Sequence, residues 1–200
     1  MKELSFILIM NGCFVFFGQS TKEYLYDGYL KFQANDYKGA IQDFNHGISL
    51  DPTNTECYSW RAYANLILEN FTEAISDYDK LIELNPKDTG AYYNRGCAKG
   101  NLNYFNSAIS DFNKAIELDN NYALAFNVRG YSKLMLEDFS GSLQDYNKAI
   151  ELNPDHHTAY YNRGFAKLEL GDTDGACFDW RKAIELGDED AYAAVKEFCH

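Results

Sequence analysis

The sequence lacks the short motifs that mark the common classes of enzyme. It has no Gly-x-x-x-x-Gly-Lys phosphate loop, no His-Glu-x-x-His, no Gly-x-Ser-x-Gly and no Gly-x-Gly-x-x-Gly. No two cysteines have Cys-x-x-Cys spacing, and His156 and His157 are the only adjacent histidines. Neighbouring side chains at a helix start point about 100° apart and seldom share a metal. We therefore expect an exposed histidine pair, no metal, no cofactor and no enzymatic activity.

Clustered basic residues are also missing. The 200 residues include 30 Asp and Glu against 18 Lys and Arg, which gives a net charge of −12, and no basic run occurs. Binding to nucleic-acid phosphates requires clustered Lys and Arg, so nucleic acid is excluded as a partner. The acidic residues are spread along the chain, as expected for a solvated outer face. The expected partner is a protein or a peptide.

Long apolar runs are missing except within residues 1–20. Residues 6–10 and 14–17 are strongly apolar, but Asn11 and Gly12 interrupt them, and the whole is too short for a comfortable membrane span. Lys2 precedes the first apolar stretch. This arrangement is typical of a secretory signal peptide.

The end of this segment offers two cleavage points. Gly18 and Ser20 are small residues at the −3 and −1 positions of a cleavage after Ser20, and cleavage directly before Gln19 is the alternative. Two other interpretations remain open: lipidation at Cys13, and a retained N-terminal anchor or tail. The main prediction is a signal peptide at residues 1–20 and an extracytoplasmic location, periplasmic or secreted.

What the sequence has instead is a repeat of 34 residues. Residues 111–118 read DFNKAIEL, and residues 145–152 read DYNKAIEL; AYYNRG at residues 91–96 returns at residues 159–164. Counting from Thr21 gives five units without insertion or deletion: 21–54, 55–88, 89–122, 123–156 and 157–190. Such a fixed period predicts stacked units, none of which can bury its apolar face alone.

Small and large residues recur at fixed positions within the units. Position 8 holds Gly28, Ala62, Gly96, Gly130 and Gly164. Position 20 holds Ala40, Ala74, Ala108, Ser142 and Ala176; position 24 holds Phe44, Tyr78, Phe112, Tyr146 and Trp180. Position 27 holds Gly47, Leu81, Ala115, Ala149 and Ala183. Steps of four and then three residues place positions 20, 24 and 27 on one helical face.

This pattern resembles the tetratricopeptide repeat (TPR) family, over residues 21–190. Pro52, Pro86 and Pro154 stand at position 32, where proline ends the second helix of a unit. The sequence departs from the family at position 7, usually Leu, which here is Asp27 and then Arg in the other four units. The resemblance implies an all-α fold, a right-handed α-solenoid of five helix-turn-helix units. Residues 191–200 would add a lone C-terminal capping helix.

Charged residues recur as well. Arg at position 7 and Asp at position 23 are expected to form ion pairs between helices rather than a catalytic site. The arginines at position 7 are Arg61, Arg95, Arg129 and Arg163. The aspartates at position 23 are Asp43, Asp77, Asp111, Asp145 and Asp179. The lysines at position 11 are expected to lay their aliphatic stems on the core and to point their ammonium groups toward solvent.

The first helix of each unit supplies the candidate binding site. Large rings and amides recur at positions 5, 6 and 9, which fall on one helical stripe. The resemblance implies that this stripe lines a concave groove where partner peptides lie. The rings and amides predict that the peptide is extended and largely neutral or apolar. The candidate residues are Tyr26, Tyr29, Trp60, Tyr63, Tyr93, Asn94, Asn127, Tyr131, Tyr161 and Asn162.

Two functions are compatible with such a groove. The first is a non-enzymatic scaffold or adaptor that binds a protein segment. The alternative is a structural repeat protein that assembles through its edges in a cell-envelope or secreted complex.

The cysteines give one further prediction. Cys57 and Cys97 fall in first helices of different units, where free buried thiols are expected. Cys177 lies in the last second helix and Cys199 in the terminal helix, which must dock on its predecessor. We expect a disulfide between Cys177 and Cys199 that holds the terminal helix in place.

Overall fold

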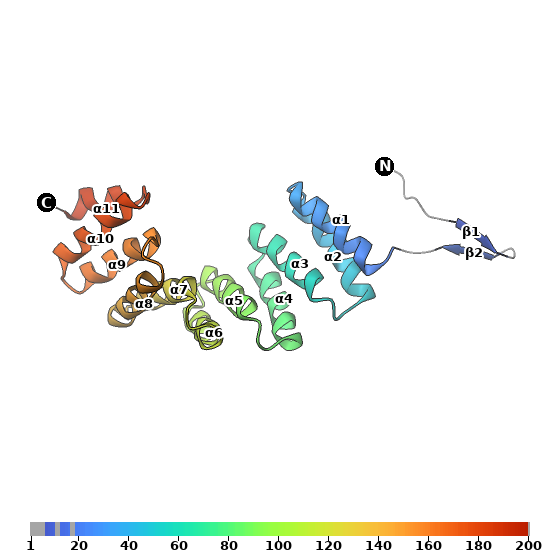
Figure 1. Cartoon of the computed structure of the whole chain (residues 1–200), viewed down its shortest axis with the longest axis horizontal. Coiled ribbons are helices and arrows are strands. Elements are labelled where there is room, and N and C mark those ends of the chain that lie inside the picture. Colours follow the sequence, from blue (N-terminus) through green and yellow to red (C-terminus); the bar gives the residue numbers. More distant parts are fainter. Residues whose placement is uncertain (1–6, 11–12, 17–18, 200) are drawn as a thin grey trace. The chain divides into compact units, whose positions relative to one another are not determined.

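The computed structural model describes residues 7–10, 13–16 and 19–199, with side chains from residue 19 onward (Figure 1). From Thr21 the described chain is a succession of helices, which confirms the all-α class. The helices are α1 (Thr21–Gln33), α2 (Tyr37–Leu50), α3 (Thr55–Ile67), α4 (Phe71–Leu84), α5 (Thr89–Asn101), α6 (Phe105–Leu118), α7 (Ala123–Leu134), α8 (Phe139–Leu152), α9 (His157–Glu169), α10 (Thr173–Glu185) and α11 (Ala191–Phe198).

A β-hairpin precedes the helices. Strand β1 (Ile7–Met10) pairs antiparallel with β2 (Cys13–Phe16), with Ile7 opposite Phe16 and Met10 opposite Cys13. Aromatic and β-branched residues favour strands, but no strand was predicted for these residues from the sequence. The signal peptide expected at residues 1–20 falls partly outside the described residues, since residues 1–6, 11–12 and 17–18 are not among them.

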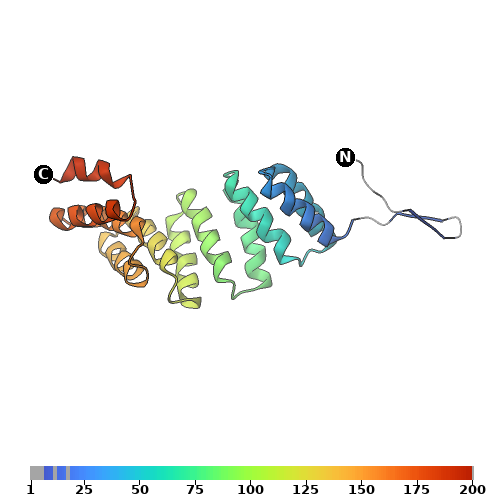
Figure 2. The same ribbon diagram turned by 45° about the horizontal axis from the view of Figure 1, so that its top comes forward.

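The chain divides into two compact units, each larger than a single 34-residue repeat. The first ends at Lys80 and the second begins at Leu81. In the first unit α1 packs on α2, and α2 packs on α3. In the second unit each helix from α5 to α11 packs on the next one (Figure 2). The first helices of the five repeats begin at Thr21, Thr55, Thr89, Ala123 and His157, so the 34-residue period of the sequence is also a period of the structure.

The two helices of each repeat are joined by a turn with one residue in the left-handed backbone conformation. The residue at position 15 is Asn35, Glu69, Asn103, Glu137 or Gly171, with φ between 58° and 83°. Glycine and asparagine adopt this conformation readily, whereas glutamate does so at a cost. The turn geometry is therefore preserved even where the residue disfavours it.

The small residue at position 8 accepts the aromatic ring at position 24 of the same repeat. A Cβ atom built on Gly28 would lie 2.6 Å from Phe44 Cε1, and one on Gly96 would lie 2.6 Å from Phe112 Cε1. At Gly164 it would lie 2.3 Å from Trp180 Nε1. These distances are too short for a real contact, so the glycines are what allows the two helices of a repeat to approach.

The recurring arginines and aspartates form ion pairs inside each of the four repeats that have the arginine, as expected. Nε of Arg95 donates to Asp111 at 3.0 Å, and Nε of Arg163 donates to Asp179 at 2.8 Å. The same arrangement joins Arg61 to Asp77 and Arg129 to Asp145. The third guanidinium nitrogen bonds to the preceding repeat: Nη1 of Arg163 donates to Asn147 Oδ1 at 2.7 Å.

The prediction for the lysines at position 11 is wrong. Nζ of Lys99 lies 2.8 Å from Asp111 Oδ2, and Lys167 makes the same contact with Asp179. Their ammonium groups turn inward because each buried aspartate has a second carboxylate oxygen to satisfy, and lysine supplies a second positive charge there. The structure thus holds one Asp between two cations in each of these repeats.

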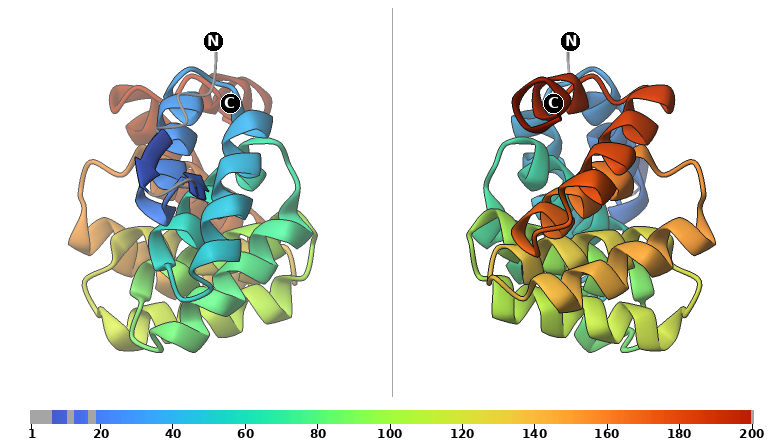
Figure 3. Two further views of the ribbon diagram at one scale, coloured as in Figure 1. Left: turned by 90° about the vertical axis from the view of Figure 1, so that its right-hand side faces the viewer. Right: turned by 90° about the vertical axis from the view of Figure 1, so that its left-hand side faces the viewer.

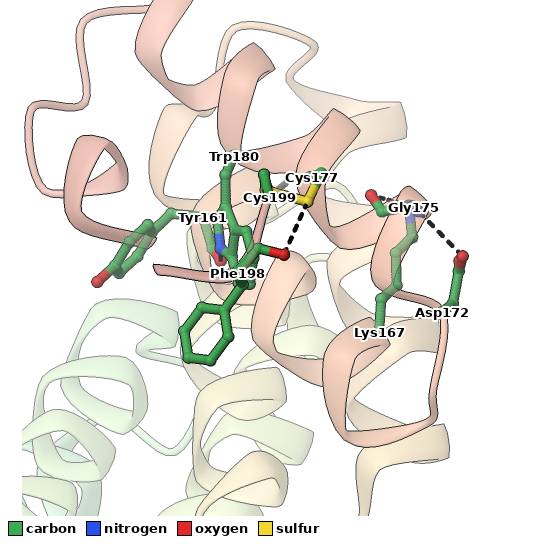
Figure 4. The surroundings of a disulfide bond; sticks show 8 residues. All are labelled: Tyr161, Lys167, Asp172, Gly175, Cys177, Trp180, Phe198 and Cys199. Carbon is green, nitrogen blue, oxygen red and sulfur yellow. Dashed lines mark hydrogen bonds between the residues drawn. A yellow bond between two sulfur atoms is a disulfide. The ribbon is translucent and has the colours of Figure 1, made fainter. Parts of the chain in front are cut away.

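Helix α11 covers the last repeat. Its Ala191 and Ala194 are buried against Ala183 and Trp180 of α10, and Val195 and Phe198 pack against the same cluster. The right-hand view of Figure 3 looks at this end of the chain, with α11 in dark red. A disulfide joins Cys177 of α10 to Cys199, directly after α11, with Cα atoms 5.7 Å apart (Figure 4).

Candidate functional site

In each unit the first helices of successive repeats touch one another. In the second unit α5 contacts α7 and α7 contacts α9; in the first unit α1 contacts α3. The residues at positions 5, 6 and 9 lie along these helices. Each unit therefore presents a face made of first helices, and we describe the two faces separately.

In the second unit, four of the candidate residues meet around one open pocket of about 550 Å³, here called the α7–α9 pocket. Helix α7 contributes Asn127, Val128 and Tyr131; α9 contributes His157, Thr158, Tyr161 and Asn162; and residues 187–190, between α10 and α11, complete it. Asn127, Tyr131, Tyr161 and Asn162 were predicted from the sequence, and the other lining residues were not.

A second pocket of about 280 Å³, here called the α5–α7 pocket, lies on the other side of α7. Cys97 and Asn101 of α5 and Phe105 of α6 contribute to it. Val128 and Tyr131 line both pockets. The Tyr131 side chain is 44% exposed, so a ligand lying across α7 could contact this ring from either side.

Asn127 is the least solvated of the candidate residues. Only 6% of it is exposed, and its Oδ1 atom is buried without a hydrogen-bond partner. Leaving a buried carbonyl oxygen unpaired is unfavourable. Asn127 was expected to hold a peptide backbone; in the structure this residue lines the α7–α9 pocket with its acceptor oxygen buried and unpaired.

Three carboxylates, those of Asp188, Glu189 and Asp190, border the α7–α9 pocket. Asp188 is buried, and its Oδ2 atom lies 3.0 Å from Nδ1 of His157. Burial raises the pKa of Tyr161, and the charges of Asp190 and Asp188 raise it further. The Tyr161 hydroxyl therefore stays neutral.

The expectation of an exposed histidine pair is wrong for His156. His157 is exposed, but His156 is buried, and its Nε2 atom has no hydrogen-bond partner. Burial lowers the pKa of His156, and the neighbouring His157 lowers it further. His156 directly precedes α9, and residue spacing alone does not reveal that its side chain is buried. Among the described residues, no group of His, Cys, Asp and Glu is arranged to hold a metal ion.

The thiols expected to be free are free. Cys57 is buried and Cys97 is half-buried in the α5–α7 pocket. Burial raises the pKa of each thiol to about 11. Since a protonated thiol is a poor nucleophile, neither group suggests catalysis.

In the first unit, the candidate rings divide between packing and exposure. The Trp60 ring lies 5.0 Å from that of Tyr29 and 5.2 Å from that of Phe32, so it packs α3 against α1. Tyr26 and Tyr63 are 62% and 41% exposed. The exposed tyrosines are therefore better candidates for ligand contact than Trp60.

The remaining two candidates lie on α5. The Tyr93 ring packs against Tyr122 at 4.9 Å and against Phe112 at 6.2 Å. Asn94 is half-buried. Tyr93 thus contributes to packing inside the repeat, which reduces the ring area available to a ligand.

The helices that the structure describes include none of the length and hydrophobicity that a bilayer span requires. This finding concerns only those helices. The interpretation of Cys13 as a lipidation site also remains a prediction, because no side chain is described there.

Comparison with known proteins identifies the repeat. Sequence profiles described as "Tetratricopeptide repeat" match residues 28–54, 55–88, 89–122 and 157–187. A further profile, described as "TPR repeat", matches residues 134–171. None of the curated proteins matches the sequence.

Solved structures resemble the chain over most of its length. A crystal structure of MamA protein is 26% identical, with a TM-score of 0.79, over 88% of this chain and 96% of that one. YrrB, described as a TPR protein with an unusual peptide-binding site, is 20% identical, with a TM-score of 0.74, over 88% and 92%. A tetratricopeptide repeat protein from Parabacteroides merdae is 19% identical, with a TM-score of 0.76, over 90% and 75%.

Proposed function

Because the chain belongs to the tetratricopeptide repeat family, we propose that it is a non-enzymatic scaffold that binds an extended segment of a partner protein along its first helices. The observation that carries this proposal is the α7–α9 pocket, where Asn127, Tyr131, Tyr161 and Asn162 meet. Two rings and two amides at one open pocket suit a peptide. Aromatic rings pack against peptide side chains, and a side-chain amide can donate and accept hydrogen bonds with any peptide backbone. The peptide-binding site named for YrrB is consistent with this use of the fold.

The geometry supports an extended ligand better than a small compact one. The α5–α7 and α7–α9 pockets share Val128 and Tyr131, so they follow one another across α7. A segment bound in both would cross the exposed Tyr131 ring. Aromatic anchors of this kind lose little conformational freedom on binding and commonly dominate affinity.

The test uses peptide segments of partners recovered by affinity capture from the extracytoplasmic fraction. Binding is measured by calorimetry for the wild type and for Tyr131→Ala and Tyr161→Ala, with circular dichroism to verify folding. We expect each variant to lose about 2 kcal/mol of binding free energy. Tyr104→Ala is the matched control, since Tyr104 is 59% exposed just before α6. Equal losses in all three variants, or no loss in any, would contradict the proposal.

The alternative function, assembly through the edges, predicts a different result. Helix α11 covers α10 at the C-terminal edge and buries Ala191 and Ala194 there, which argues against stacking of a further copy on that edge. A concentration-dependent oligomer in gel filtration would favour edge assembly. A monomer would favour the adaptor.

We also propose that the protein is exported and that residues 1–20 are removed. The apolar leader supports this, as does the Cys177–Cys199 disulfide, because such bonds persist in oxidising compartments. The intact mass of protein from the exported fraction should correspond to a chain beginning near Gln19 or Thr21. Recovery of the chain with Met1 attached would contradict cleavage.

A further inference from the structure

The α7–α9 pocket has an acidic side with no internal counter-charge from Lys or Arg. Asp188, Glu189 and Asp190 border it, and its described lining contains neither of the basic residue types. Glu189 and Asp190 are exposed and form no ion pair within the part of the chain that the structure describes. The Asp188 carboxylate is hydrogen-bonded to the His157 ring. The pocket therefore has carboxylates available for an incoming cation.

Helix capping does not account for these carboxylates. Acidic residues are favoured where a helix begins, and Asp190 stands just before α11. However, the Asp190 side chain makes no capping hydrogen bond. Its carboxylate is not engaged by the backbone of its own helix.

Asn127 provides a second, independent indication of a ligand. It is 6% exposed, lines the same pocket, and its buried Oδ1 atom has no hydrogen-bond partner. This oxygen requires a donor. Asn127 lies on α7, whereas residues 187–190 lie between α10 and α11, so the oxygen and the carboxylates reach the pocket from different elements. A guanidinium group carries five N–H donors in a planar fork and could serve an amide oxygen and a carboxylate together.

The aromatic walls suit the same ligand. Tyr131 is 44% exposed and Tyr161 is half-buried, and the face of a tyrosine ring attracts a cation. The carboxylates near Tyr161 would strengthen that attraction by adding negative charge beside the ring. Rings, carboxylates and an unpaired amide oxygen thus converge on one chemical class.

We propose that the α7–α9 pocket binds a basic side chain, arginine in preference to lysine, of a segment from a partner protein. The inference rests on the proposed peptide-binding function and deepens it, because the sequence pattern alone indicated a neutral or apolar ligand. The bound cation would lie between the Tyr131 and Tyr161 rings, donating to Asn127 Oδ1 and to the carboxylates of Glu189 and Asp190. Arginine is preferred because lysine offers a single ammonium group without the planar fork.

The experiment compares two acetylated and amidated heptapeptides with apolar flanking residues. One has a central arginine, and the other has citrulline, which keeps the shape but removes the charge. Dissociation constants are measured by NMR titration at low ionic strength, using the side-chain amide of Asn127 as a reporter. We expect the arginine peptide to bind about tenfold more tightly, with the difference shrinking as salt is added.

Variants then locate the effect. Glu189→Gln/Asp190→Asn should abolish the preference for arginine, and Asn127→Leu should reduce it. The control Glu169→Gln/Glu197→Gln removes the same charge from exposed residues that do not line the pocket, and it should retain the preference. Circular dichroism verifies that each variant is folded.

The outcomes separate this inference from the function on which it rests. Equal binding of the two peptides, weakened by Tyr131→Ala, would overturn the basic-side-chain proposal and leave peptide binding standing. A preference for arginine lost equally in the control would also overturn it, since the net charge would then be the cause. No binding of either peptide would count against both proposals.

Discussion

Arg129 and Asp145 form a two-point ion pair between α7 and α8, with Nε donating to Oδ2 at 2.9 Å and Nη2 to Oδ1 at 2.5 Å. The remaining Nη1 donates to Asn113 of the preceding repeat at 2.7 Å. Lys133 completes the group, with its Nζ atom 2.8 Å from Asp145 Oδ2. One buried carboxylate therefore pairs with two cations, and one of these cations also joins two repeats.

Replacing Asp145 should destabilise the fold strongly. Asp145→Asn would leave Arg129 and Lys133 without an anion in a site where Asp145 is 3% exposed. We expect a loss of about 3 kcal/mol in the free energy of unfolding, as for other buried pairs that lose one partner. Urea titration followed by circular dichroism measures it. Glu151→Gln is the control, because the exposed Lys148–Glu151 pair should contribute less than about 1 kcal/mol; equal losses would refute the difference in burial as the cause.

Two glycines of α5 should respond oppositely to alanine. A Cβ atom on Gly96 would lie 2.6 Å from the buried Phe112 ring, whereas one on Gly100 would meet nothing within 4 Å. Gly96→Ala should destabilise by about 1–3 kcal/mol through overpacking. Gly100→Ala should stabilise by about 0.5–1 kcal/mol, since alanine favours the helix. Thermal unfolding of both variants provides the comparison, and a stabilised Gly96→Ala would show that the ring can move away.

The turn between α7 and α8 should be improved by glycine. Glu137 has φ of 61°, where a side chain is strained, while Gly171 occupies the equivalent place with φ of 83°. Glu137→Gly should raise stability by about 0.5–1 kcal/mol, and Gly171→Ala should lower it by a similar amount. Both are read from urea unfolding midpoints. A loss of stability in Glu137→Gly would mean that the flexibility added to the unfolded chain outweighs the strain removed.

The disulfide should protect α11 from local opening. Cys177→Ser/Cys199→Ser should increase hydrogen exchange in α11, with a loss of about 3 kcal/mol for a loop of this length. Cys97→Ser is the control for removing a thiol elsewhere. Alkylation of the unreduced, denatured protein should leave Cys177 and Cys199 unlabelled. Labelling of both would show that the bond does not form.

The start of α1 should be sensitive to acid. Ser20 caps this helix: its Oγ accepts from the Glu23 backbone N–H, and Glu23 accepts from the Ser20 backbone N–H at 2.7 Å. These hydrogen bonds lower the pKa of Glu23 from 4.5. The contribution is therefore present above pH 4.5 and is lost as the pH falls through the lowered value. In a chain that retains Ser20, Ser20→Ala should lower the melting temperature at pH 7, and the difference from the unmutated chain should shrink on acidification; a constant difference would contradict the link to Glu23.

The sequence predicted the fold well because its repeat is regular. Gly164 and Trp180 could be paired from their positions alone, since every repeat places a small and a large residue sixteen apart. The contact of the Lys99 ammonium group with Asp111 could not be predicted in this way. Helical spacing tells on which face of the helix a side chain lies, but not where the end of a flexible side chain points. The choice depends on a second aspartate oxygen that only the packed helices reveal.

The candidate site was predicted only in part, for a related reason. Asn127, Tyr131 and Tyr161 follow the period and were found by counting residues. Residues 187–190 lie where the repeats end, so no period indicates that they return to the wall formed by α7 and α9. Trp60 follows the period but packs on Tyr29, because spacing does not distinguish a ring that faces a ligand from one that faces a neighbour.

The ion pairs have a consequence for how such a chain can change its length. In each of the repeats with this set, the arginine, the aspartate and, where present, the position-11 lysine belong to the same 34 residues, and only a neutral amide is borrowed from the preceding repeat, as Asn147 is by Arg163. Copying such a segment would insert a complete set of charges, and deleting one would strand none. Gain or loss of whole 34-residue repeats therefore leaves every buried aspartate with its cations, and the DFNKAIEL and DYNKAIEL segments show how little two such repeats can differ.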